Sequence, residues 1–249
     1  MSNLSRTIKG RARCALHGKY GVPMICMVIL VAAYLIISSP FNYSVVISQK
    51  STSIIIYVIA NILLFLVLFE AGIGFSYTLL KIARNEKPEI KDLLFAFLNR
   101  PDRFIPVFLV KDGIFFVCLL PSFILMFMPV TQATFVGYSM IGSTLTIIGC
   151  IAGVLITVRF VLAEFLMIDH PEYSGMDGIR ESMRLMKGRN KSMLYIYVSF
   201  LGYVALCILS FNLGFLWVAP YMAETLCFFY LDTIGEPMVI PESEQFEEE

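Results

Sequence analysis

The chain has 249 residues, of which 58% are hydrophobic and 15% charged, and nineteen basic residues balance nineteen acidic ones. Soluble domains contain about 45–50% apolar and about 25% charged residues, so this chain has too little polar surface to cover a soluble core. The same figures exclude collagen-like, disordered, disulfide-scaffold and nucleic-acid-binding proteins, and they predict an all-α polytopic membrane protein.

Six apolar runs are long enough to cross a bilayer as helices, which takes about 20 residues each. Barrel strands would instead show about ten residues of alternating polarity. We therefore predict six transmembrane helices in a single membrane domain, residues 1–232. The first run is expected to be kept rather than cleaved as a signal peptide, because it is long and no small-residue cleavage pattern follows it. The predicted spans are residues 21–38, 53–80, 104–128, 145–168, 193–210 and 215–231.

Lys and Arg residues gather in every second connection between the predicted spans. The segment before the first span holds five of them, the second connection six and the fourth connection five, whereas the first connection holds only Lys50. Cytoplasmic loops of membrane proteins carry such an excess of positive charge. We therefore predict a multi-pass protein of the cytoplasmic membrane with both termini in the cytoplasm.

Each of the three basic segments combines a short amphipathic stretch with a turn that leads into a span. The segments recur at roughly eighty-residue spacing, as three helix-plus-hairpin units would, although any hairpin protein that obeys the charge rule would look similar. In the third segment, Ser174 and Asp177 resemble a capping box. The apolar stripes are Ile90, Leu93, Leu94 and Phe97; Met176, Ile179, Met183 and Met186; and, less clearly, Ile8, Ala12 and Leu16.

The third basic segment is the predicted membrane-surface site. A helix of this kind either lies in the headgroup layer, where clustered Lys and Arg attract anionic lipid, or packs over the cytoplasmic ends of the bundle. Its basic residues are Arg180, Arg184, Lys187, Arg189 and Lys191.

Ionisable residues inside the predicted spans form a second candidate site, because each would be costly if it faced lipid. Interhelical ion pairs are the expected solution. The candidate partners are Glu70 or Asp112 for Arg159, and Glu224 or Glu70 for Lys111. The group is either a polar cavity that binds a cation, a proton or a polar headgroup, or a set of salt bridges that fixes the helix register. It comprises Glu70, Lys111, Asp112, Arg159, Glu164 and Glu224.

Further sequence motifs bear on helix packing and on which kinds of catalytic or metal site the chain can form. Gly149 and Gly153 lie four residues apart in the fourth span and would allow close helix contact. The six cysteines form no C-x-x-C pair, and no nucleotide-binding, hydrolase or metalloprotease motif is present. We therefore expect no metal, no cofactor and no catalytic residue.

Residues 233–249 are expected to form an acidic cytoplasmic tail, either solvated or docked on a partner.

Three stretches carry a family resemblance. They are residues 72–74 with 82–86 and 92–95, residues 163–171 with 178–188, and residues 214–217 with 220–221 and 229–230. Through them the chain resembles the bacterial integral membrane proteins grouped as domain of unknown function 975. The most specific part is Ile-Arg-x-Ser-x-x-Leu-Met-x-Gly at residues 179–188. The resemblance implies a multi-span helical protein, mostly from Gram-positive bacteria, and it implies no reaction, ligand or catalytic residue. At Glu70 the family is expected to have small or apolar residues.

The leading functional hypothesis is a non-enzymatic membrane protein whose basic, amphipathic cytoplasmic face binds anionic membrane lipid or another membrane protein. The alternative is a small transporter or channel that uses the intramembrane charges, and a third possibility is an intramembrane enzyme. Nucleic acid is not an expected partner, since the basic residues are balanced by acidic ones and follow the membrane topology.

Overall fold

The computed structural model describes residues 2–48, 51–126 and 135–236, and the regular secondary structure in this part of the chain is entirely helical. Within these residues, five helical segments are long and apolar enough to cross a membrane, which makes the chain a multi-pass membrane protein by length and composition. The sixth predicted span also forms a helix, Phe215–Ile234, but it is not among these five. The five are Gly21–Ser39, Ile56–Ala83, Pro101–Leu125, Val136–Asp169 and Asn190–Leu209.

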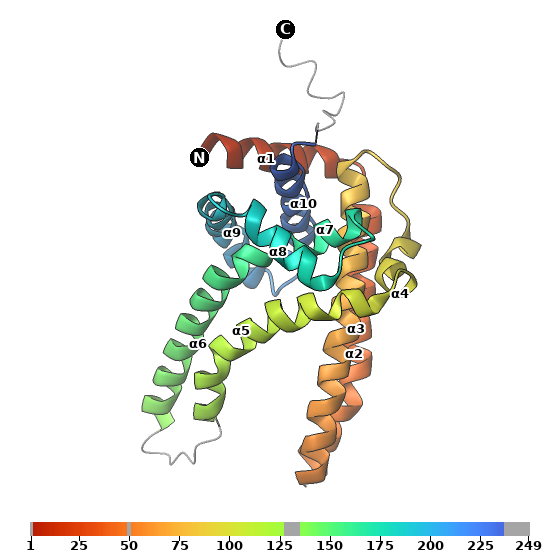
Figure 1. The fold of residues 1–249 in the computed structure, drawn as a ribbon. Helices are drawn as coiled ribbons and strands as arrows, with labels where there is room; N and C mark the ends of the chain where they lie inside the picture. The colour runs from red at the N-terminus through yellow and green to blue at the C-terminus, as the bar shows by residue number, and fades with distance from the viewer. Residues whose placement is uncertain (1, 49–50, 127–134, 237–249) are drawn as a thin grey trace. The chain divides into compact units, whose positions relative to one another are not determined.

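The chain folds as two compact units, drawn as a ribbon in Figure 1. Unit 1 contains residues 1–104 and 195–249, and unit 2 contains residues 105–194. Unit 1 comprises α1 (Ser2–Leu16), α2 (Gly21–Ser48), α3 (Ser51–Ala83), η1 (Ile90–Leu94), α4 (Phe95–Leu98), η2 (Pro101–Arg103), most of α9 (Asn190–Leu209) and α10 (Phe215–Ile234). Unit 2 comprises α5 (Ile105–Met126), α6 (Phe135–Thr157), η3 (Val158–Phe160), α7 (Ala163–Asp169) and α8 (Gly175–Leu185).

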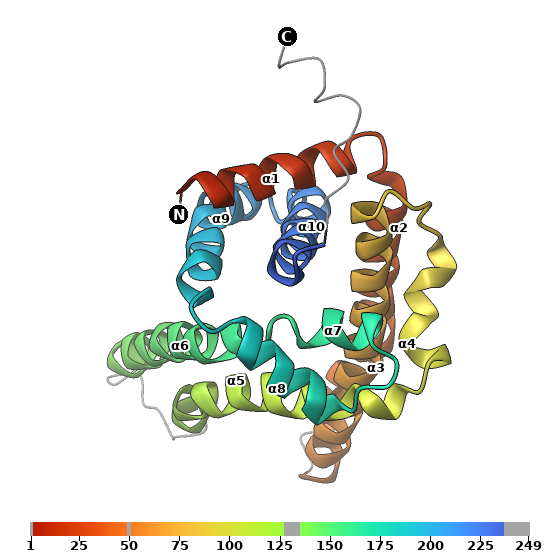
Figure 2. The ribbon, with the colours of Figure 1, turned by 45° about the horizontal axis from the view of Figure 1, so that its top comes forward.

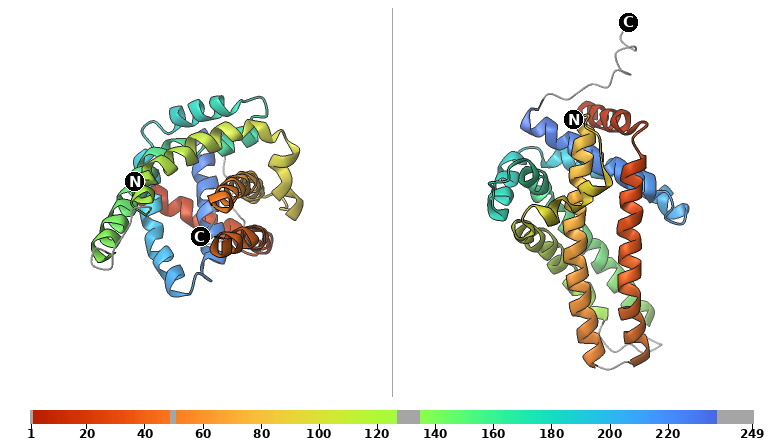
Figure 3. Two further views of the ribbon diagram at one scale, coloured as in Figure 1. Left: turned by 90° about the horizontal axis from the view of Figure 1, so that it is seen from below. Right: turned by 90° about the vertical axis from the view of Figure 1, so that its right-hand side faces the viewer.

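In unit 1 the two longest helices, α2 and α3, pack along one another, and α1 lies across the end of the pair at which α2 begins (Figure 1; Figure 3, right). α1 packs against α10 and α3, and its predicted stripe of Ile8, Ala12 and Leu16 is fully buried. α10 packs against α1, α2 and α3 and crosses the α2–α3 pair obliquely (Figure 3, right). The buried core of unit 1 is therefore concentrated at this end.

The rest of the α2–α3 pair exposes apolar side chains. Leu35, Ile36, Ile62 and Leu63 are all more than half exposed. Helices satisfy their own backbone hydrogen bonds and can present such a surface to lipid tails. The exposed part of the pair is therefore the part suited to the hydrocarbon layer.

The connection from α3 to unit 2 differs from the predicted amphipathic helix. It forms the 3-10 helix η1 and the single turn α4, both packed on α3. The carboxylate of Asp92 accepts a 2.8 Å hydrogen bond from the Lys81 ammonium, and a Cβ at Gly74 would collide with the Leu93 carbonyl. These two contacts fix which side of the segment faces α3. Of the predicted stripe only Leu93 is buried, while Ile90, Leu94 and Phe97 are exposed.

In unit 2, α5 and α6 pack closely through the glycines that the sequence singled out. A Cβ at Gly149 would lie 2.5 Å from the Cys118 carbonyl oxygen, and one at Gly153 would lie 2.5 Å from the Phe115 ring. Both distances are too short for any real Cβ contact without movement. The predicted close contact at Gly149 and Gly153 is therefore confirmed.

The predicted span 145–168 lies within the candidate span Val136–Asp169, but the regular helix in this region, α6, begins at Phe135 and stops at Thr157. The chain then forms η3 and a turn before α7 begins at Ala163. At the break, the Ser182 hydroxyl donates to the Arg159 carbonyl at 2.9 Å and accepts from the Leu162 amide at 3.2 Å. A side chain from α8 thus supplies hydrogen bonds to backbone groups that have no partner within the helix at the break.

The residue that follows α10 and its C-terminal turn is held in unit 1 by an ion pair. Arg84, just after α3, donates bonds of 2.9 and 2.7 Å from Nε and Nη2 to the two carboxylate oxygens of Glu236. Glu236, the first glutamate of the predicted acidic segment, is therefore held by an ion pair. Residues 237–249, the first-connection residue Lys50 and residues 127–134 lie outside the described residues.

Candidate functional site

The six predicted intramembrane charges are divided between the two units. Glu70 lies on α3 and Glu224 on α10, both in unit 1, and the other four lie in unit 2. The predicted pairings of Arg159 with Glu70, and of Lys111 with Glu224 or Glu70, would link the two units, and they stay predictions.

In unit 1 the two glutamates are buried without a hydrogen-bond partner among the described residues. Glu70 is 5% exposed and Glu224 is 0% exposed, and both oxygens of each carboxyl group lack a partner. Buried polar groups are nearly always hydrogen-bonded, because leaving one unsatisfied costs free energy. These two positions therefore need an explanation beyond packing.

Among the predicted intramembrane residues of unit 2, Lys111 forms an ion pair with Glu164, a partner that was not predicted from the sequence. The Arg159 side chain is exposed beside the break after α6. α6 has 23 residues and alone spans about 34 Å, enough to cross a hydrocarbon layer of about 30 Å. Arg159 and Glu164 therefore follow a helix that is by itself long enough to cross, although both also lie within the candidate span Val136–Asp169.

The predicted surface helix α8 carries acids as well as bases. Its capping box is confirmed, because the Ser174 side chain accepts from the Asp177 amide and the Asp177 side chain accepts from the Ser174 amide. Hydrogen bonds that the Ser174 hydroxyl and the Ser174 amide donate to the Asp177 carboxylate lower the pKa of Asp177. Asp177 and Glu181 lie three residues before Arg180 and Arg184, and each pair forms an ion pair. Of the predicted stripe, Ile179 and Met186 are buried, whereas Met176 and Met183 are exposed.

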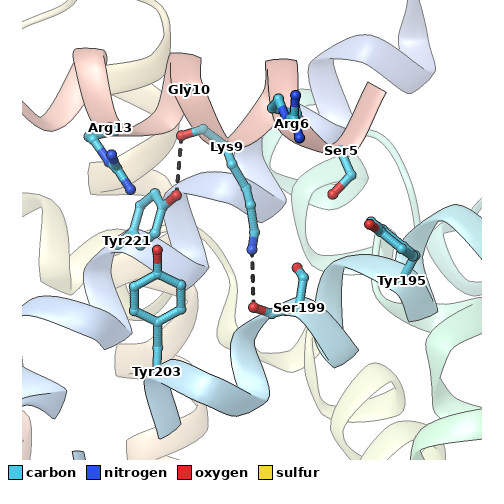
Figure 4. A pocket seen from close by; sticks show the side chains of 9 residues that line it. All are labelled: Ser5, Arg6, Lys9, Gly10, Arg13, Tyr195, Ser199, Tyr203 and Tyr221. Carbon is cyan, nitrogen blue, oxygen red and sulfur yellow. Dashed lines mark hydrogen bonds between the residues drawn. The ribbon is translucent and has the colours of Figure 1, made fainter. Parts of the chain in front are cut away.

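A pocket between α1, α9 and α10 is the site that sequence reasoning missed. All of its residues belong to unit 1, and α1 runs past the other two helices (Figure 2). Its volume is about 330 Å³. Three of the nine lining residues are cations, three are tyrosines and none is acidic (Figure 4). The lining comprises Ser5, Arg6, Lys9, Gly10, Arg13, Tyr195, Ser199, Tyr203 and Tyr221.

Lys9 reaches from α1 into the pocket toward α9. Its ammonium donates to the Ser199 carbonyl at 3.3 Å and lies 4.0 Å from the centre of the Phe200 ring (Figure 4 shows the hydrogen bond). Cation–π contact of this kind fixes a lysine head without neutralising it. Burial lowers the pKa of Lys9, and the positive charge of Arg13 lowers it further. The pocket therefore holds positive charges that repel one another.

Tyr221 joins α10 to α1 at the other side of the pocket. Its hydroxyl donates to the Lys9 carbonyl at 3.4 Å, and the Arg13 guanidinium lies 5.7 Å from its ring. Rings of Phe200 and Tyr203 pack against Tyr221 at 5.2 and 6.1 Å. Aromatic packing thus positions Tyr203 and Tyr221 in the pocket lining beside Lys9 and Arg13.

Two sequence signals could have revealed part of this pocket. Arg6, Lys9 and Arg13 recur at helical spacing, and no acid precedes Glu70 in the chain. Tyr195, Ser199 and Tyr203 are likewise four residues apart on one face of α9. That these two rows face each other depends on the tertiary packing of segments almost two hundred residues apart, which neither row indicates.

Comparison with known proteins identifies a family and nothing more specific. A family model described as a protein of unknown function, DUF975, matches residues 1–235. No curated protein matches the chain, and no solved structure matches it.

Proposed function

The chain belongs to the DUF975 family of proteins of unknown function, and from that premise we propose that it is a non-enzymatic integral membrane protein that binds anionic lipid at its basic end. The observation that carries the proposal is α1, a cationic helix that lies across the end of α2 and α3 with its apolar stripe buried beneath it (Figure 1).

The charge of α1 favours anionic lipid more strongly than that of α8 does. α1 carries Arg6, Lys9, Arg11 and Arg13 and no acid. In α8 the two arginines are each paired with an acid one turn away. A Lys or Arg near an anionic membrane surface contributes about 1 kcal/mol of attraction, so α1 is the stronger of the two candidates. Arg180, Arg184, Lys187, Arg189 and Lys191 remain a secondary surface in this proposal.

The contacts within unit 1 support a sixth crossing by α10. Tyr195 near the start of α9 shares the pocket with α1, and Glu236 after α10 pairs with Arg84 after α3. Lys19 donates a 2.7 Å bond to Asn85, so the turns after α1 and α3 lie at the same end. A return through α10 would bring a chain that leaves this end along α9 back beside Arg84. We therefore propose six spans with the basic end, and both termini, in the cytoplasm.

Lipid enrichment tests this function. The full chain would be reconstituted in mixed phosphatidylglycerol and phosphatidylcholine, extracted gently, and its retained lipid quantified. We expect phosphatidylglycerol to be enriched over the bulk mixture, and the enrichment to decline with added salt, because surface charge attraction is screened. Retained lipid with the bulk composition at low salt would contradict the proposal.

A second candidate function is ion or proton transport through the bundle. The observation that favours it is the pair of buried glutamates, Glu70 and Glu224, whose carboxyl oxygens have no hydrogen-bond partner among the described residues. Intramembrane acids often mark ion and proton pathways.

Flux in proteoliposomes tests this candidate. We expect cation or proton flux to be lost in Glu224→Gln and retained in Glu172→Gln, since Glu172 is exposed. Flux that is absent from the wild-type chain, or unchanged in Glu224→Gln, would exclude transport at this residue.

A further inference from the structure

We propose that the pocket between α1, α9 and α10 binds the phosphate group of a membrane lipid headgroup, an inference that rests on the proposed function and names its site. The ligand chemistry is a phosphate ester held by Arg6, Lys9 and Arg13.

Charge is the first argument. Three cations line the pocket and none of its nine lining residues is acidic, so an anion would relieve repulsion that the protein itself leaves in place. Arg guanidinium groups match phosphate oxygens in pairs, and Lys provides a point charge. The contact of Lys9 with Phe200 and the Ser199 carbonyl keeps that ammonium in position before a ligand arrives.

The neutral lining is the second argument. Hydroxyl groups of Ser5, Tyr195 and Tyr203 belong to the same lining, and hydroxyls can donate to phosphate oxygens. The volume of about 330 Å³ lies at the low end of ligand pockets, which span about 300–1,000 Å³. The pocket therefore suits one small, polar, anionic group rather than an extended ligand.

The position of the pocket favours a lipid as the source of that phosphate. α9 is a candidate span, and Val198 and Leu201, beside the pocket residue Ser199, are 63% and 62% exposed. α1 lies across the unit where the span α2 begins (Figure 2). A headgroup in the pocket could thus continue into acyl chains along the exposed apolar face of α9, whereas a soluble phosphate would gain nothing from that face.

Binding to the full chain in detergent tests the proposal, with two variants that remove the same charge. Lys9→Gln with Arg13→Gln changes the pocket, while Lys87→Gln with Lys91→Gln removes two exposed cations that do not line it. The probes are short-chain phosphatidylglycerol, short-chain phosphatidylcholine and glycerol 3-phosphate, followed by native mass spectrometry. We expect the pocket variant to lose affinity for phosphatidylglycerol by about tenfold or more, because charge-assisted hydrogen bonds are lost. The control should stay within about twofold of wild type, since Lys87 and Lys91 do not line the pocket.

A charge-conserving variant and the comparison of the three probes distinguish the possible results. Lys9→Arg keeps the charge and should retain binding, and thermal unfolding of each variant shows whether it is folded. If both double variants bind as wild type, or lose affinity equally, the pocket is not the site even though lipid enrichment stands. If glycerol 3-phosphate binds as tightly as the lipid, a soluble phosphate is the ligand and the lipid assignment is overturned. If the wild-type chain shows no preference over phosphatidylcholine, the proposed function itself fails.

Discussion

Ser182 lies in the most specific stretch of the family pattern, residues 179–188, and its side chain has a structural role. Its hydroxyl bridges the Arg159 carbonyl and the Leu162 amide across the break after α6. Two further residues of the same stretch have local roles, because Met186 is fully buried and Gly188 adopts a φ of +89° that favours glycine. Backbone geometry and packing thus account for Ser182, Met186 and Gly188 within the pattern at residues 179–188.

Ser182→Ala is expected to destabilise the protein by about 1–3 kcal/mol, because two backbone groups at a buried break lose their partner. Thermal unfolding can be followed with a thiol-reactive dye, since Cys26, Cys207 and Cys227 are buried and become reactive on unfolding. Ser139→Ala is the matched control, because the exposed Ser139 bonds only within its own helix. Equal unfolding temperatures for the two variants would show that the bridge is dispensable.

Helix pairing in unit 2 depends on glycines at one face of α6. Gly149→Ala places a Cβ against the Cys118 backbone carbonyl, a contact that only movement of α5 or α6 can relieve. Overpacking of this kind costs about 1–3 kcal/mol. Gly137→Ala, on the same helix, meets nothing within 4 Å and should be neutral or stabilising, because alanine favours helix. A Gly149→Ala protein as stable as Gly137→Ala would rule out close packing at this face.

Local features of these elements were predictable from the sequence, and features set by distant segments were not. The capping box at Ser174 and the close approach at Gly149 follow from neighbouring residues, and both are confirmed. The break after Thr157 was missed because hydropathy stays high through Val158 and Leu162. The side chain that bonds to the backbone at the break belongs to Ser182, twenty residues after Leu162. The pocket was missed for the same reason, since its cations and tyrosines come from opposite ends of the chain.

At the scale of the whole molecule, three turns share one backbone feature. Gly18, Arg100 and Gly188 all have positive φ, each between a short helix and the start of a long apolar one. The positive φ of Arg100, where glycine would be less strained, shows that the turn itself requires this geometry. The three helix-plus-hairpin units stay a prediction, because positive φ also occurs at Asn85, Phe211, Asn212 and Gly235, outside these turns.

The proposed topology places the three basic turns on the same side of the membrane, and the headgroup site requires α1 to lie at that charged surface. Single cysteines at His17, Arg100 and Lys187, in a chain whose six native cysteines are replaced, can be labelled with a membrane-impermeant maleimide in sealed vesicles of known orientation. We predict that all three label from the cytoplasmic side and that Leu213→Cys, between α9 and α10, labels from the other. Labelling of any two basic turns from opposite sides would contradict this arrangement.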